Sequence, residues 1–101
     1  MTTTATPAKI VLTAAVAKLS TLQMFEALED LDGRAGEWLV GLTPEEVIVR
    51  DELIDAIEKR HRLQTATLDV LSELETSEPF GNIAYPRVLR LAMGRTGQTI
   101  A

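Results

Sequence analysis

Residues 42–62 read LTPEEVIVRDELIDAIEKRHR, and this stretch decides the fold class. Thr43 is followed by Pro44 and, three residues after the threonine, by Glu46, which is the spacing of a capping box with proline in the first helical position. The threonine oxygen can accept from free N–H groups of the first turn, and the glutamate can reach back to the threonine N–H. The sequence therefore predicts a helix that begins at Pro44 and runs at least to Arg60.

The same stretch has the periodicity of an amphipathic helix. One half of its helical wheel is mostly apolar and holds Val47, Val49, Arg50, Leu53, Ile54, Ala56, Ile57 and His61. The other half is charged and offers two i, i+4 pairs with the acid first, Asp55–Lys59 and Glu58–Arg62. Such pairs contribute a few tenths of a kcal/mol each (~0.2–0.5), so they tune this helix and the apolar half anchors it.

Upstream, the sequence predicts one bent helix or two helices over residues 7–32. Ser20 and Gln23 repeat the capping-box spacing, and Gly33 is a natural helix end. The β-branched pair at residues 10–11 leaves a short strand as the alternative near the start.

Downstream, leucines at helical spacing continue the pattern. We expect a break over residues 63–67, where β-branched and polar residues cluster, while a single helix over residues 44–75 stays open as the alternative. A last helix is expected to begin near Tyr85 and to end at Gly94 or Gly97.

No run of the sequence alternates with period two for more than a few residues, so we expect an all-α fold. The length of 101 residues fits a single domain over residues 1–101, a small bundle of four or five helices with short loops. Aromatic residues make up only 4% of the chain, which predicts an aliphatic core. Residues 1–6 and 98–101 are expected to be mobile or held by a partner.

Composition excludes several classes of protein. The chain has no cysteine, so it has neither disulfides nor thiolate metal sites, and it suits a reducing compartment. Its net charge of −5 makes it acidic, which disfavours non-specific binding to nucleic acid or to an anionic membrane. The apolar run at residues 10–19 is too short to span a bilayer. We therefore expect no membrane partner and a cytoplasmic location.

The residues that could carry chemistry do not form a recognisable catalytic set. His61 is the single histidine and lies in the apolar half of its helix, which favours a structural histidine over a general base. Glu58 and His61 make one Glu-x-x-His step, whereas a carboxylate metal site needs two. The glycine-rich turns at residues 33–36 and 94–97 lack the Lys and Ser/Thr of a phosphate loop. We expect no enzyme activity, no metal, no cofactor and no small-molecule substrate.

Two places in the sequence are candidates for a protein interface. Trp38, Leu39 and Val40 lie between the two best-defined helices, where they either plug the end of the bundle or form an exposed docking anchor. Arg50 lies inside the apolar half of its helix. It either pairs with Glu46 one turn back or serves as an interface arginine.

The charge is divided unevenly along the chain. Residues 1–78 contain all 15 acidic residues, whereas residues 79–101 contain Arg87, Arg90 and Arg95 and no acid. The basic segment either packs on the acidic body of the molecule or contacts nucleic acid as the last helix of a helix-turn-helix. Three arginines are a small electrostatic footprint beside so acidic a body, so we expect nucleic acid to be the less favoured partner.

A family resemblance rests on two phrases of the sequence. Residues 27–32 read ALEDLD and precede the LTPEE helix with its later arginine, isoleucine–aspartate and basic end. This order resembles that of short uncharacterised helical proteins of actinobacteria and their phages, over about residues 20–62. The resemblance implies a phage or prophage origin, and hence the host cytoplasm or the virion, and it carries no site residues.

Together these observations predict a non-catalytic helical protein that binds another protein or itself, as an interaction or assembly component. In a variant of this hypothesis, the acidic helix at residues 44–60 imitates a phosphate backbone and blocks a DNA-binding partner. The alternative function is a small nucleic-acid-binding regulator that uses the three C-terminal arginines.

Overall fold

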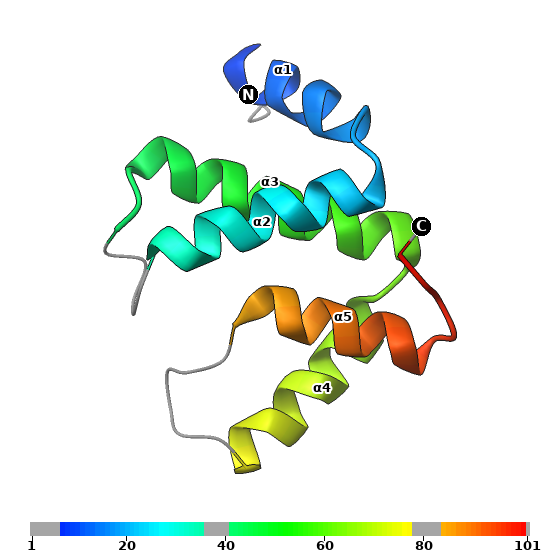
Figure 1. Cartoon of the computed structure of the whole chain (residues 1–101). Helices are drawn as coiled ribbons and strands as arrows, with labels where there is room; N and C mark the ends of the chain where they lie inside the picture. Colours follow the sequence, from blue (N-terminus) through cyan, green and yellow to red (C-terminus); the bar gives the residue numbers. More distant parts are fainter. Residues whose placement is uncertain (1–6, 36–40, 78–83, 101) are drawn as a thin grey trace, which may run out of the picture.

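The computed structural model of the chain describes residues 7–35, 41–77 and 84–100, and every regular element within them is helical. The helices are α1 (Pro7–Ala17), α2 (Thr21–Ala35), α3 (Pro44–His61), α4 (Gln64–Ser77) and α5 (Tyr85–Arg95). In Figure 1, α1 lies at one end of the molecule and α4 and α5 at the other, with α2 and α3 between them. The expected all-α fold is confirmed.

Both predicted capping boxes are formed. The Thr43 Oγ1 accepts from the Glu46 N–H at 3.2 Å, and the Thr43 N–H donates to Glu46 Oε1 at 3.0 Å. At the start of α2, Ser20 Oγ accepts from the Gln23 N–H at 3.1 Å, and the Ser20 N–H donates to Gln23 Oε1 at 2.9 Å. These reciprocal bonds satisfy N–H groups that the first turn of a helix leaves without partners, so both helices begin where the sequence predicted.

The open questions about helix breaks are settled in favour of breaks. Residues 7–35 form two helices separated at residues 18–20, and residues 10–11 are helical, so the strand alternative is wrong. Helix α2 passes Gly33 and ends at Ala35, two residues beyond the expected stop. Helix α5 ends at Arg95, between the two glycines considered for its end.

The break between α3 and α4 consists of Arg62 and Leu63, and Arg62 adopts the left-handed conformation with φ 55° and ψ 51°. Its N–H donates to the Glu58 carbonyl and closes the helix. Because this turn removes Arg62 from the helical face, the expected ion pair with Glu58 does not form among the described residues. The other expected pair is present, with Lys59 Nζ 2.9 Å from an oxygen of Asp55.

Helix α3 is the centre of the packing, since it contacts each of the other four helices. Helices α2 and α3 lie against each other, as do α4 and α5, and α5 also contacts α2. Helix α1 packs mainly on α3. The chain therefore closes one core, which every helix shares.

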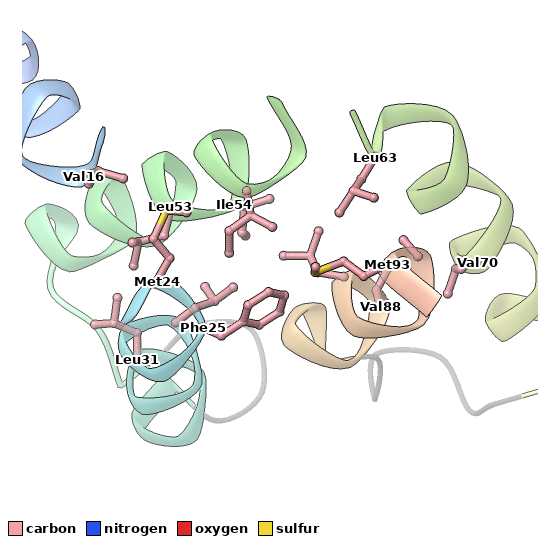
Figure 2. Close-up of a cluster of buried hydrophobic side chains, with 14 of the residues drawn as sticks. Val16, Met24, Phe25, Leu31, Leu53, Ile54, Leu63, Val70, Val88 and Met93 are labelled. Carbon is pink, nitrogen blue, oxygen red and sulfur yellow. The ribbon is translucent and has the colours of Figure 1, made fainter. Parts of the chain in front are cut away.

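The core is chiefly aliphatic, as predicted, with three additions. Phe25, Met24 and Met93 are buried among leucine, isoleucine and valine side chains. Figure 2 shows these side chains converging from α2, α3, α4 and α5, with Phe25 extending from α2 toward α5. One buried residue is polar: the hydroxyl of Thr67 in α4 has no hydrogen-bond partner within the part of the chain described.

The segment after α5 returns to the body of the molecule. We expected residues 98–101 to be mobile or held by a partner, but Gln98 bonds to His61 and Ile100 packs against the core of the same chain. Residues 1–6 and 101 lie outside the described residues. The last turn of α3 is thus covered by the chain's own C-terminal segment.

Candidate interaction surfaces

The first expected interface group, Trp38, Leu39 and Val40, lies outside the described residues. These residues join α2 to α3, and their assignment to an interface stays a prediction.

Arg50, the second expected interface residue, is held by partners on two other helices. Its Nε donates to Asp32 Oδ1 of α2 at 3.2 Å, and its guanidinium carbon lies 5.7 Å from the ring centroid of Tyr85 in α5. The expected pairing with Glu46 does not occur, because Glu46 Oε2 bonds to Arg34 Nη1 at 2.6 Å and its Oε1 completes the capping box. Arg50 therefore ties together α2, α3 and the start of α5.

A hollow of about 210 Å³ opens beside this arginine. Its lining is formed by Arg50, Asp51, Ile54, Asp55, Glu58 and Tyr85. Burial raises the pKa of the Glu58 carboxyl, and the neighbouring charge of Asp55 adds to this effect. Burial also raises the pKa of the Tyr85 hydroxyl, with Glu58 contributing. The hollow is thus rich in negative charge on its α3 side.

The basic residues of α5 are engaged with acids of the same molecule. Arg90 Nη2 lies 2.9 Å from Glu29 Oε1 of α2, and its guanidinium carbon lies 4.9 Å from the centroid of the Phe25 ring. Arg95 forms an ion pair with Glu73 of α4. Arg87 is exposed on the same helix, one turn before Arg90. These contacts favour the interpretation in which the basic helix packs on the acidic body.

A shallow cleft of about 390 Å³ separates α2 from α5. It is lined by Glu29, Asp32, Gly33, Ala84, Pro86, Arg87, Arg90 and Leu91. The Glu29–Arg90 ion pair spans it, so its charged groups already neutralise one another in part. The cleft is wide open to solvent, whereas small-molecule sites usually enclose most of their ligand.

His61 contacts side chains of the same chain through both ring nitrogens, which favours the expected structural role. Its Nδ1 lies 2.7 Å from Gln98 Oε1, and its Nε2 lies 2.8 Å from Thr21 Oγ1. The amide nitrogen of Gln98 donates to the His61 carbonyl at 2.9 Å and to Thr96 Oγ1 at 2.8 Å, which leaves Oε1 to accept from the imidazole. Both ring nitrogens are therefore used in joining α2, α3 and the C-terminal segment.

No group of three or more metal-ligating side chains occurs among the residues that the structure describes. Nor does any described helix have the length and apolar character needed to cross a membrane.

A surface that the sequence-based prediction did not single out lies on α1. Within residues 11–17, Val11, Ala14 and Ala15 are exposed, while Val16 is buried and Leu12 is partly buried against the core. Surface helices normally direct a polar stripe toward solvent. The signal was present in the sequence, since no charged residue occurs between Lys9 and Lys18.

Comparison of the chain with models of known protein families, with curated proteins and with solved structures finds no match.

Proposed function

We propose that this protein is a non-catalytic interaction or assembly protein that binds another protein or a second copy of itself. The observation that supports this proposal most directly is the apolar outer side of α1. Val11 is 67% exposed, and Ala14 and Ala15 on the same side of the helix are exposed as well. Covering this side with another protein surface removes apolar area from water, which favours association.

Trp38, Leu39 and Val40 remain part of the proposed interface. Aromatic and arginine anchors contribute most to binding at protein interfaces, and this chain offers one tryptophan in a short connection. Arg50 borders the hollow of about 210 Å³ that Tyr85 also lines, and Asp32 fixes its guanidinium. The arginine is therefore preorganised for a partner that fills this hollow.

We further propose a phage or prophage setting, which rests on the sequence phrases over about residues 20–62 alone. A component or assembly factor of a phage particle would act in the host cytoplasm or in the virion. The absence of cysteine suits either location.

The test is the solution mass measured by light scattering over a range of concentrations, at low and at high salt. The proposal predicts a species larger than a monomer, or a complex with a partner protein, that persists at high salt because apolar contacts dominate. A protein that stays monomeric, captures no protein partner and instead binds duplex DNA with an affinity that falls steeply with salt would overturn it in favour of nucleic-acid binding.

A further inference from the structure

Two helical faces on this molecule have matching spacing and complementary character. The first, the α1 face, consists of Val11, Ala14 and Ala15 together with Lys18 in the turn that ends the helix. These residues follow an i, i+3, i+4, i+7 pattern, so they lie along one side of the helix. The apolar end of the face is therefore at Val11 and the charged end at Lys18.

The second, the α3 face, consists of Ile48, Asp51, Glu52 and Asp55 and lines a hollow of about 360 Å³. Its members follow the same i, i+3, i+4, i+7 pattern. Ile48 is 53% exposed, although its three neighbours on this face are carboxylates. Here too an apolar residue stands at one end and a charged residue, Asp55, at the other.

The charges decide which faces can meet. The first 25 residues contain two lysines and no acid, so two α1 faces that met would offer Lys18 no counter-charge in either register. Two α3 faces would bring together six carboxylates. When an α1 face meets an α3 face, Lys18 lies against carboxylates, and neither lysine meets lysine nor carboxylate meets carboxylate.

The α3 carboxylates have capacity for another cation. Glu52 forms no ion pair within the described ranges. Asp51 and Asp55 each have one basic neighbour on their own helix, and both stay more than half exposed. Exposed ion pairs of this kind contribute little to stability, so a cation from another molecule can bind these carboxylates at small cost.

We propose that the α1 face of one copy of this chain docks in parallel on the α3 face of a second copy. In the parallel register Val11 meets Ile48 and Lys18 meets Asp55. The antiparallel register would set Val11 against Asp55 and leave both the apolar and the ionic contact unmade. The inference rests on the proposed function and names the partner and the surface.

This arrangement has a consequence for assembly. The two faces differ, so the contact is heterologous, and each copy keeps one free face of each kind after the first contact. Such contacts either close into a ring or continue as a chain of molecules. Each face is only two helical turns long, so a single contact is weak and the degree of association should rise steadily with concentration.

The first experiment compares Val11→Asp with Leu68→Asp by sedimentation velocity over a wide concentration range. Both residues are 67% exposed on helices, so the two substitutions introduce the same charge at equally exposed positions. Val11→Asp is expected to weaken self-association by about tenfold or more, because it removes the main apolar contact, while Leu68→Asp leaves it unchanged. Circular dichroism confirms that both variants fold.

The second experiment exchanges the charges of one contact. Lys18→Glu and Asp55→Lys should each weaken self-association, and an equimolar mixture of the two variants should associate again to the extent of the wild type, with the two variants alternating. Only an α1–α3 contact predicts this recovery, because one contact in the mixture pairs the two reversed charges and the other pairs the two unchanged ones. Recovery supports the inference, and its absence overturns it.

The outcomes separate this inference from the function on which it rests. If the wild type associates and Val11→Asp does not weaken that association, the α1–α3 contact is wrong while self-assembly through another surface stands. If the wild type is a monomer at every concentration, the second copy is wrong as the partner, and the proposed function then depends on binding a different protein.

Discussion

Arg50 of α3 and Asp32 of α2 form an ion pair that is largely shielded from solvent, with side-chain exposures of 13% and 20% and an Nε–Oδ1 distance of 3.2 Å. Such a pair resists screening by water better than an exposed one does. Replacing Arg50 by Ala leaves a half-buried carboxylate without its donor. We expect a loss of about 1–2 kcal/mol in the free energy of unfolding, measured by urea denaturation.

The same α2 helix supplies a control for this prediction. Asp30 and Arg34 form an i, i+4 pair at 3.3 Å whose side chains are both more than half exposed. Asp30→Ala should cost no more than about 0.5 kcal/mol. Equal losses for the two variants would show that the Arg50–Asp32 pair is no more stabilising than a surface contact.

Two glutamates of α3 should have opposite effects on the pH dependence of stability. The backbone N–H of Thr43 and then Arg34 lower the pKa of Glu46, so its contribution is present above the pKa of the unfolded chain and is lost as pH falls through the folded value. Glu46→Gln should therefore lower stability at neutral pH, and the difference from wild type should shrink in acid.

Glu58 should behave in the reverse way. Burial, with Asp55 adding to it, raises the pKa of Glu58, so its contribution is full below the unfolded pKa and is lost as pH rises through the folded value. Glu58→Gln should raise stability at neutral pH, with a gain that disappears in acid. Thermal unfolding of both variants from pH 3 to 8 tests the pair, and curves of the same sign would refute the assignment.

Thr67 predicts a stabilising substitution. Its side chain is 2% exposed, and its hydroxyl finds no partner within the described residues. Thr67→Val keeps the shape and removes the unpaired hydroxyl, so a gain of about 1 kcal/mol is expected. Thr67→Ser keeps the hydroxyl and removes the methyl group, and it should be destabilising. A loss of stability in the valine variant would indicate that the hydroxyl has an acceptor in solution.

His61 and Gln98 predict a defined tautomer. The Gln98 amide nitrogen donates to the His61 carbonyl and to Thr96, so the imidazole Nδ1 must carry the proton that Gln98 Oε1 accepts. Nitrogen-15 NMR of the neutral ring should show the proton on Nδ1. Gln98→Ala removes these bonds and should cost about 1–2 kcal/mol. A proton found on Nε2 would contradict this network.

The helix starts were predictable because their signals are local. Thr43 and Glu46, or Ser20 and Gln23, are three residues apart, and their mutual bonds depend on the helix alone. The break after α3 was expected within residues 63–67. It lies at residues 62–63 and so overlaps that region at its first residue. Arg62 ends the helix one residue early because it adopts the left-handed conformation, which residue preference does not indicate.

The partners of charged residues were less predictable. Arg50 bonds to Asp32, which is 18 residues away on another helix, and the nearer Glu46 is drawn to Arg34 and to the helix cap. His61 and Gln98 are 37 residues apart, and no pattern in the sequence links them. The apolar content of α1 was visible, but which of its sides stays uncovered depends on how it packs on α3.

The central position of α3 implies an order of protection in hydrogen exchange. Every other helix contacts α3, so its amide protons around Leu53 and Ile57 should exchange only when the whole molecule unfolds. Helix α1 rests mainly on one neighbour, assisted by Arg60, which donates to the carbonyls of Ala17 and Leu19. Its amides should exchange through a smaller local opening, and any partner that covers the α1 face would slow them first.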